Sequence, residues 1–189
     1  MKVVIAEDEA IVRLDLKEIL EENGYEVVAD TGRGDEVVAL VRQHGPDLAI
    51  LDIKMPGLDG LSAAREITEQ RLAAVLVLTA FSQRNLVEQA RDAGVLAYLV
   101  KPFQASELIP AIEVALGRFV ELQALERHGR RLEDQLETRK AVDRAKGKLM
   151  DERGLKEAEA FGFIQQTAMR LRLTMSEVAQ QVMDGQLTP

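Results

Sequence analysis

Three carboxylates stand where short apolar runs of the sequence end. Glu7 and Asp8 follow the run at residues 2–6, and Asp52 closes the run at residues 47–52. A few hard oxygen ligands are what Mg²⁺ prefers, and a divalent cation would relieve the repulsion between such groups. An aspartate beside that cation could attack a phosphoryl donor and become an acyl phosphate. The pattern therefore indicates phosphoryl chemistry on Asp52.

Two more residues complete this set. Thr79 ends the next apolar run, and Lys101 follows the last one. A hydroxyl and an ammonium group suit the oxygens of a transferred phosphoryl group, through neutral and charge-assisted hydrogen bonds. A lone aspartate after a strand is commonly a loop cap, so the prediction depends on the whole set in its order.

Short runs rich in Val, Ile and Leu alternate with segments of helical period over residues 1–117. This alternation predicts an α/β domain with a five-stranded parallel, doubly wound sheet. Ligands of such sheets bind beyond the carboxyl ends of the strands, so the polar residues above should converge in one pocket. The predicted strands are residues 2–6, 26–30, 47–52, 74–79 and 96–100.

The helical segments each offer an apolar face, and glycines stand where helices should end: Gly24, Gly45, Gly94 and Gly117. The predicted inward-facing residues are, in chain order, Ile11, Leu14, Ile19 and Leu20; Val37, Val38 and Val41; Leu61, Ala64 and Ile67; Leu86, Ala90 and Ala93; Leu108, Ile112 and Leu116.

The pattern after Gly117 is helical throughout, with no Gly/Ser-rich linker, so we expect a continuous helix to join the two parts. The first apolar stripe (Leu122, Leu125, Leu132, Leu136) fits either a short coiled coil or packing on the same chain. Gly154 should end that helix. A second stripe is predicted to be core (Ala158, Phe161, Ile164, Ala168, Leu171), and Thr174 with Glu177 predicts a capping box before a last helix that ends at Gly185.

Charge is divided unevenly along the chain. Residues 1–117 hold 11 of the 24 Lys/Arg and 20 of the 32 Asp/Glu, whereas residues 139–148 carry five basic residues against one acidic. The acidity therefore belongs to the first part, and the second has a local basic face. Cysteine is absent, and no apolar stretch is long enough for a signal peptide or a membrane span, so we expect a cytoplasmic protein.

The first 117 residues resemble the receiver domain of response regulators. The resemblance rests on Glu7-Asp8, on Asp52 with the segment 55–60 (MPGLDG), on Thr79-Ala80, and on Tyr98 with Lys101-Pro102. It implies a flavodoxin-like fold, phosphorylation of Asp52 by a sensor histidine kinase, and Mg²⁺ held by Asp8, Asp52, the backbone carbonyl of Lys54 and, through water, Glu7. It also implies that Thr79 and Lys101 grip the phosphoryl group, that Tyr98 and Thr79 reorient on activation, and that the bond before Pro102 is cis. From the residues alone, an ordinary, partly buried strand aromatic is the alternative for Tyr98.

Two side chains could shield an acyl phosphate from water. Lys54 and Phe81 lie two residues beyond Asp52 and Thr79. We therefore expect a phosphoryl lifetime longer than that of variants with alanine at these positions.

The C-terminal part resembles the ANTAR domain, a three-helix RNA-binding module of transcription antitermination regulators. The resemblance covers about residues 125–185 and rests on 145–150 (AKGKLM), Glu157-Ala158, Ala160-Phe161, Ala168-Met169 and 177–179 (EVA). It implies binding to hairpin RNA in nascent transcripts, indirect action on the RNA polymerase elongation complex, and a homodimer on phosphorylation. We expect phosphate contacts from Lys140, Arg144, Lys146 and Lys148. Phe161 and Phe163 could stack on bases, but Phe161 is predicted to be core.

We expect a receiver domain at 1–117, a helical linker at 118–124 and an RNA-binding domain at 125–189.

A DNA-binding output is an alternative, because residues 173–179 (LTMSEVA) resemble the first helix of a helix-turn-helix, yet only six residues follow Met183, too few for a recognition helix. A purely protein-binding output is a second alternative. A phosphohydrolase is a third, but the Glu7-Asp8-Glu9 order does not fit its usual Asp-x-Asp. We expect a regulator and not an enzyme, since the receiver acts only on itself.

Overall fold

The computed structural model describes residues 1–80 and 84–189, and the side chains of residues 84–86 are outside the description. It divides into two compact units, Met1–Gln123 and Ala124–Pro189, which we treat one at a time. In the described residues, no helix combines the length and the apolar character that crossing a bilayer would need.

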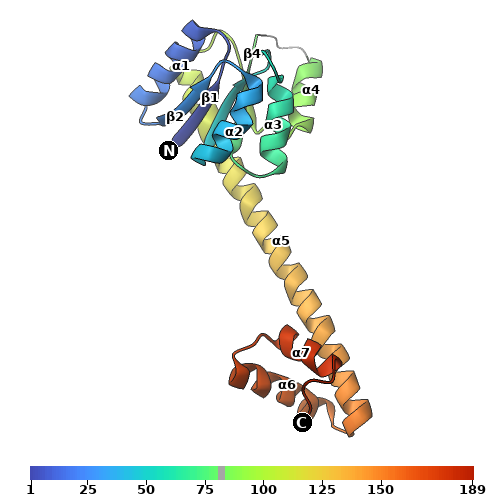
Figure 1. Ribbon diagram of the computed structural model, residues 1–189. Helices are drawn as coiled ribbons and strands as arrows, with labels where there is room; N and C mark the ends of the chain where they lie inside the picture. Colours follow the sequence, from blue (N-terminus) through green and yellow to red (C-terminus); the bar gives the residue numbers. More distant parts are fainter. Residues whose placement is uncertain (81–83) are drawn as a thin grey trace. The chain divides into compact units, whose positions relative to one another are not determined.

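The first unit is built on a five-stranded parallel sheet in the order β2-β1-β3-β4-β5 (Figure 1). This order confirms the predicted doubly wound α/β fold, and its switch point lies between β1 and β3. All five predicted strands are present, with bounds shifted by at most one residue. They are β1 (Lys2–Ala6), β2 (Glu26–Thr31), β3 (Leu48–Asp52), β4 (Ala74–Thr79) and β5 (Ala97–Val100).

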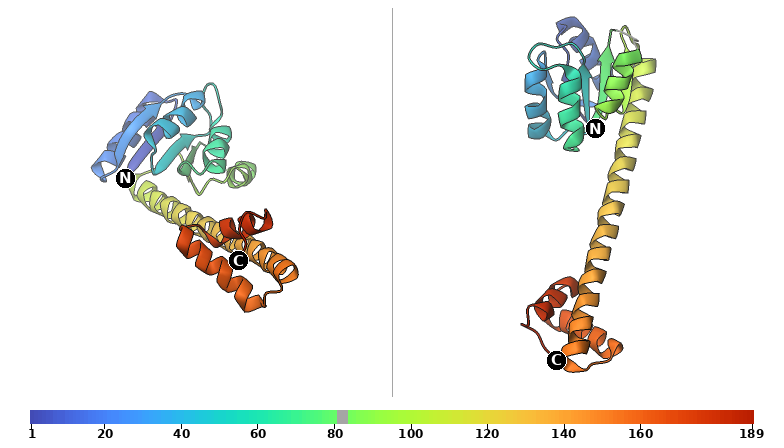
Figure 2. Two further views of the ribbon diagram at one scale, coloured as in Figure 1. Left: turned by 60° about the horizontal axis from the view of Figure 1, so that its bottom comes forward. Right: turned by 90° about the vertical axis from the view of Figure 1, so that its right-hand side faces the viewer.

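Helices cover both faces of the sheet. Because successive side chains of a strand point to opposite faces, alternate residues belong to two different cores. Val3 and Ile5 pack with α1 and the first turns of α5, whereas Val4 and Ala6 pack with α2 and α3. Figures 1 and 2 show α2 and α3 side by side on their face. The helices of this unit are α1 (Ala10–Glu22), α2 (Gly34–His44), α3 (Gly60–Glu69), α4 (Arg84–Asp92) and the start of α5 (Ala105–Arg153).

The predicted inward face of α1 is partly wrong. Leu16 and Leu20 are buried and Ile19 is partly buried, but Ile11 and Leu14 are 78% and 65% exposed. At 100° per residue, positions 16, 19 and 20 share one face, and positions 11 and 14 lie nearly opposite it. The predicted faces of α2, α3 and the first turns of α5 are confirmed, as are Ala90 and Ala93 on α4, whereas the Leu86 side chain lies outside the described residues.

Gly24, Gly45 and Gly94 follow helices with positive φ, as predicted for C-terminal caps. The prediction that a helix ends at Gly117 is wrong, because α5 continues without a break to Arg153. A glycine inside a helix costs only about 1 kcal/mol relative to alanine, which the packing of Leu116 and Ile112 outweighs. The predicted continuous helix is therefore present, and it ends at Gly154 (φ 67°).

The second unit contains the C-terminal part of α5, α6 (Glu157–Leu171) and α7 (Met175–Met183). Their common core is small and consists of Val142, Ala145, Leu149, Ala160, Ile164, Ala168, Val178, Ala179 and Val182. The predicted capping box is present: the Thr174 hydroxyl accepts from the Glu177 backbone N–H (3.2 Å), and the Glu177 carboxylate accepts from the Thr174 N–H (2.7 Å). This bond keeps the pKa of Glu177 below its usual value.

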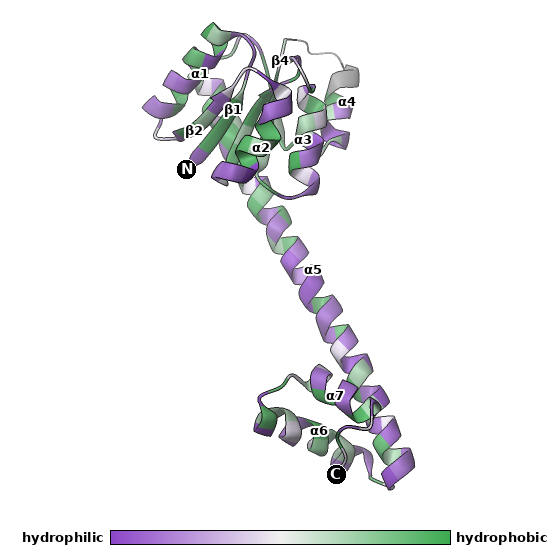
Figure 3. Cartoon of the chain, in the orientation of Figure 1, coloured by the Kyte–Doolittle hydropathy of each residue, from purple (hydrophilic) through white to green (hydrophobic). Residues whose placement is uncertain are grey.

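The leucine stripe of α5 (Leu122, Leu125, Leu132, Leu136) is exposed, each side chain by 37% or more. Within the second unit, Leu125, Leu132 and Leu136 therefore do not pack on α6 or α7, and a coiled-coil seam stays open as the alternative. Figure 3 shows the same stretch of α5 as mainly hydrophilic, with isolated hydrophobic positions. Of the second predicted stripe, Ile164 and Ala168 are buried, but Ala158 and Leu171 are exposed, because Ala160 and Thr167 face the core instead.

Candidate functional site

The carboxyl ends of four strands meet in one pocket. It has a volume of about 320 Å³, and its lining includes Asp8, Asp52, Lys54, Thr79 and Lys101. Glu7, at the end of β1, lies beneath it and is fully buried. One oxygen each from Glu7, Asp8 and Asp52 lie within 4.8 Å of one another. The structure thus brings together the acidic residues, the threonine and the lysine that the sequence indicated.

Asp52 is only 5% exposed, and both of its carboxylate oxygens are engaged. Lys101 Nζ lies 2.8 Å from Oδ1, and the Lys54 backbone N–H donates to Oδ2 at 2.8 Å. These partners fix the carboxylate at the open edge of the sheet. It faces a pocket that can admit a small anion.

Burial raises the pKa of the Glu7 carboxyl, and the neighbouring Asp52 adds to the rise, although contact with Lys101 opposes it. For Lys101, burial works against the charged form, but its contacts with Asp52 and Glu7 outweigh burial and raise its pKa. One ammonium group therefore neutralises part of a site that contains three carboxylates.

The donor set fits a hard divalent cation. Glu7 Oε2 is buried and lies 2.6 Å from Lys101 Nζ, yet within the described chain it accepts no hydrogen bond of proper geometry. Asp8 is exposed to the pocket, and Asp52 adds a third carboxylate. An orphaned buried oxygen among clustered carboxylates is what a cation with its waters would satisfy.

The loop after Asp52 is held by backbone contacts that admit no side chain. A Cβ built on Gly60 would lie 1.9 Å from the Asp52 carbonyl oxygen, and one on Gly34 would lie 1.8 Å from the Leu58 carbonyl oxygen. The Gly60 N–H donates to the Ile53 carbonyl oxygen at 2.9 Å. Sequence reasoning gave Gly34 no role, and only its position opposite the loop reveals one.

Arg13 is a second residue that sequence reasoning missed. Its guanidinium donates to the backbone carbonyl oxygen of Glu7 and, through Nε, to Asp30 Oδ2 at 3.1 Å. The Glu7 N–H in turn donates to the Thr31 carbonyl oxygen at 3.0 Å. These bonds hold the segment that carries Glu7 and Asp8. No sequence motif marks Arg13, because its partners come from other elements.

The remaining predicted residues of this site are placed as follows. Thr79 is buried at the end of β4, and Tyr98 on β5 is about half exposed. The Lys101–Pro102 peptide bond is cis, as the resemblance implied. Phe81, the second predicted shielding residue, lies outside the described residues, whereas Lys54 lines the pocket.

The predicted basic cluster lies on α5 in the second unit, and its members differ in what they contact. Lys146 bridges Asp143 and Glu157, at 2.8 Å each, and so ties α5 to α6. These contacts raise the pKa of Lys146. Lys148 donates to the Met183 carbonyl oxygen at 2.7 Å and thereby caps α7.

Of the four predicted phosphate contacts on α5, Lys140 and Arg144 are exposed. Lys140 pairs with Glu137 at 2.8 Å, one turn away on the same helix. Arg144 lies one turn further along, and its charge contributes to the lowered pKa of Glu137. Both cations therefore remain accessible to an anionic partner.

The two phenylalanines of the second unit have exchanged their expected roles. Phe161, predicted to be core, is 41% exposed, whereas Phe163 packs against the core. The prediction for Phe161 is wrong because the inward stripe of α6 is Ala160, Ile164 and Ala168, which places position 161 at its edge.

Comparison with known proteins finds one family in the first unit and another in the second. Residues 3–113 match the family model described as response regulator receiver domain, and residues 130–183 match the ANTAR domain. The chain is 55% identical to the transcriptional regulatory protein PdtaR of Mycobacterium tuberculosis over 188 residues, which cover 100% of this chain and 92% of that protein. It is 38% identical to the chemotaxis protein CheY of Bacillus subtilis over 117 residues, 61% of this chain and 98% of that protein.

Solved structures resemble the first unit. The receiver domain of the putative response regulator NarL from Mycobacterium tuberculosis has a TM-score of 0.59 and 28% identity, over 61% of this chain and 95% of that one. A LuxR-family response regulator from Staphylococcus aureus has a TM-score of 0.58 and 32% identity, over 61% of this chain and 98% of that one.

We predict that Gly60→Ala destabilises the first unit, because its methyl group would collide with the Asp52 backbone. The loss should be roughly 1–3 kcal/mol, as for other overpacked sites. Gly117→Ala is the matched control: it has nothing within 4 Å and should leave stability unchanged or raise it by up to about 1 kcal/mol. Thermal unfolding followed by circular dichroism tests both. Equal melting temperatures for the two variants would contradict the proposed tight approach.

Proposed function

Because this chain belongs to the response regulators that join a receiver domain to a C-terminal ANTAR domain, we propose that Asp52 receives the phosphoryl group. The protein is a two-component response regulator that acts as an RNA-binding transcription antiterminator. In the proposed division, residues 1–117 form the receiver, 118–124 a helical linker and 125–189 the RNA-binding domain. Since its RNA targets are nascent transcripts, we propose that it acts in the cytoplasm.

The observation that carries the assignment is the setting of Asp52. Its carboxylate faces the pocket, and its two oxygens are oriented by Lys101 and by the Lys54 N–H. In the proposed transfer, one Asp52 oxygen forms a bond to phosphorus, and the bond between phosphorus and the nitrogen of a kinase phosphohistidine breaks. The electron pair of that bond stays on the imidazole, which takes up a proton.

Glu7, Asp8, Asp52 and the backbone carbonyl of Lys54 are the proposed ligands of Mg²⁺, with Glu7 acting through water. When bound, the ion would offset the carboxylate repulsion and the charge of the incoming phosphoryl group. The support for this proposal is the closeness of the three carboxylates and the unsatisfied Glu7 Oε2.

Thr79 and Lys101 are the proposed ligands of the new phosphoryl group. Lys101 already contacts Asp52, and both residues line the pocket. A phosphoryl group adds up to two negative charges, so Lys101 would exchange carboxylate oxygens for phosphoryl oxygens. In the proposed switch, Thr79 shifts toward the phosphoryl group and the half-exposed Tyr98 ring turns inward.

The RNA-binding face that we propose includes the basic cluster of α5 (Lys140, Arg144, Lys146, Lys148). Lys140 and Arg144 are exposed and are the members we expect to contact phosphates directly. Lys146 and Lys148 support that face through their bonds to Glu157 and to the end of α7. Antitermination then affects the RNA polymerase elongation complex indirectly, through the RNA hairpin.

A second copy of this chain is the proposed partner of the leucine stripe. Four exposed leucines at alternating spacings of three, seven and four along one helix match a short coiled-coil seam. Gly129 occupies the missing seam position and weakens it, so the homodimer should need the added effect of phosphorylation.

We predict that Asp52→Asn abolishes acyl-phosphate formation, because an amide is not a nucleophile of this kind. The protein would be incubated with a small phosphoryl donor and Mg²⁺ and examined by phosphate-affinity electrophoresis. Asp59→Asn is the matched control, since asparagine can still cap α3 where Asp59 accepts from Ser62. Removing Mg²⁺ with a chelator should also abolish labelling. A labelled Asp52→Asn protein would refute the assignment.

Replacing both Lys140 and Arg144 with alanine should weaken binding to hairpin RNA and reduce its salt dependence. Each lost phosphate contact should lower the slope of log K against log salt by about 0.7–0.9. Arg91→Ala, an exposed arginine on α4, is the control and should leave the slope unchanged. An unchanged slope in the double variant would place the phosphate contacts elsewhere.

Replacing Leu132 and Leu136 with glutamate should keep the phosphorylated protein monomeric, because buried carboxylates would oppose the seam. Analytical ultracentrifugation of the phosphorylated wild type and variant makes the comparison. Met169→Glu, on an exposed position of α6, is the control that should still dimerise. A variant that dimerises like the wild type would exclude the leucine stripe as the interface.

A further inference from the structure

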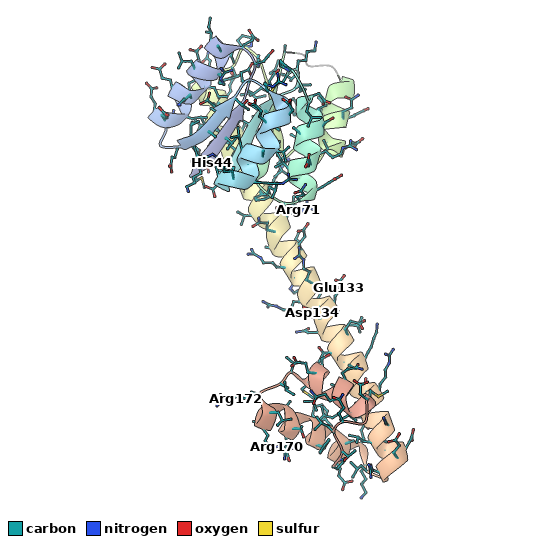
Figure 4. All side chains as sticks on the ribbon, in the orientation of Figure 1. His44, Arg71, Glu133, Asp134, Arg170 and Arg172 are labelled. Atoms are coloured by element: carbon teal, nitrogen blue, oxygen red, sulfur yellow. The ribbon has the colours of Figure 1, made fainter. Side chains whose placement is uncertain are left out.

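The exposed ring of Phe161 stands at the edge of a hollow in the second unit. The hollow has a volume of about 530 Å³, within the range of roughly 300–1,000 Å³ typical of ligand sites. Phe161 on α6 forms one wall. The rest of the lining comes from one face of α5 and includes Arg131, Asp134, Arg139 and Val142. Figure 4 marks Asp134 on this part of α5.

The two arginines of the hollow are uncommitted. In the described chain, neither the Arg131 nor the Arg139 guanidinium lies within 4.0 Å of a carboxylate, in contrast to Lys146 at the same site, which is held by Asp143 and Glu157. The positive charge of Arg139 acts on Asp143 from a longer distance and helps to lower the pKa of that carboxyl. Two free planar cations beside an exposed aromatic ring suit a partner that offers both anionic groups and a flat π surface.

The lining also offers groups that could read the edge of such a partner. Asp134 presents carboxylate acceptors, Gln135 presents an amide donor and acceptor, and Thr138 presents a hydroxyl. Val142 is buried and closes the hollow with an apolar group. An aromatic wall, an apolar floor and hydrogen-bonding side chains are the components by which proteins recognise an unstacked base.

A second copy of the chain suits this hollow less well. At 100° per residue, the face of α5 with Arg131, Arg139 and Val142 is centred about a quarter of a turn away from the face with Leu132 and Leu136. An apolar partner would bury two unpaired arginines and Asp134 without compensation. A nucleotide instead supplies phosphates to the arginines and polar base edges to Asp134.

We propose that this hollow holds one unpaired nucleobase of the RNA hairpin loop, stacked on Phe161, with the flanking phosphates on Arg131 and Arg139. The proposal rests on the RNA-binding function stated above and adds the place where the loop is read. Phe161 is then a binding residue, and the bound base would cover its exposed ring.

The experiment uses full-length phosphorylated protein and a hairpin RNA selected from a pool with a randomised loop. Phe161→Leu keeps the apolar bulk but removes the aromatic face, and should weaken binding by roughly 5- to 150-fold, the range expected for loss of one stacked base. Phe161→Tyr should restore binding. Leu171→Ala, another exposed apolar residue of α6, is the matched control and should bind like the wild type.

A second arm replaces the loop nucleotides one at a time with abasic residues. One abasic position should weaken wild-type binding to a similar degree, with little further loss in Phe161→Leu, as expected for two groups that contact each other. If Phe161→Leu binds the hairpin as well as the wild type does, the hollow is not the base site, although the RNA-binding function stands. If that variant instead alters the monomer–dimer equilibrium and binds RNA normally, the hollow is a protein interface. If the wild type selects no hairpin, both proposals fail.

Discussion

The repulsion among Glu7, Asp8 and Asp52 is the constraint on which the first unit depends. Carboxylates whose oxygens lie within 4.8 Å of one another would separate in a flexible chain. Here they are fixed at the ends of two adjacent buried strands, and Lys101, which directly follows β5, supplies the compensating charge. Among the described residues, the cation paired with Glu7 and Asp52 is Lys101, so the three carboxylates leave an excess of negative charge that suits a metal ion.

Rigid backbone around the pocket keeps this unfavourable arrangement in place. Gly60 and Gly34 allow the loop after Asp52 to pack directly on the backbone of its neighbours, and Arg13 holds the carbonyl of Glu7 from below. These contacts use backbone groups and one arginine, so the acidic side chains remain available for ligands. Bringing three carboxylates together costs free energy of folding. The burial of the apolar sheet beneath them offsets this cost, since β3 and β4 are entirely buried.

The second unit uses its charges differently. Lys146 and Lys148 connect helices within the unit, whereas Lys140, Arg144, Arg131 and Arg139 remain open to a partner. A core of nine mostly small residues leaves little apolar surface to hold three helices together. Ion pairs and caps such as the Thr174–Glu177 box therefore contribute to the packing, and the remaining cations form the binding face that we propose.

The sequence by itself determined the five parallel strands and the helix caps at Gly154 and Thr174, because these depend on local periodicity and on capping residues. It also determined the acidic pocket, because the polar residues follow the carboxyl ends of the strands. It did not determine which face of α1 or α6 turns inward, since several apolar residues compete for the core and only packing selects Leu16 over Leu14 or Ala160 over Phe161. It could not reveal Gly34 or Arg13, whose partners are distant in sequence. It also could not separate bridging lysines from free arginines in the basic cluster, because that distinction arises only when Glu157 and the end of α7 come to lie beside α5.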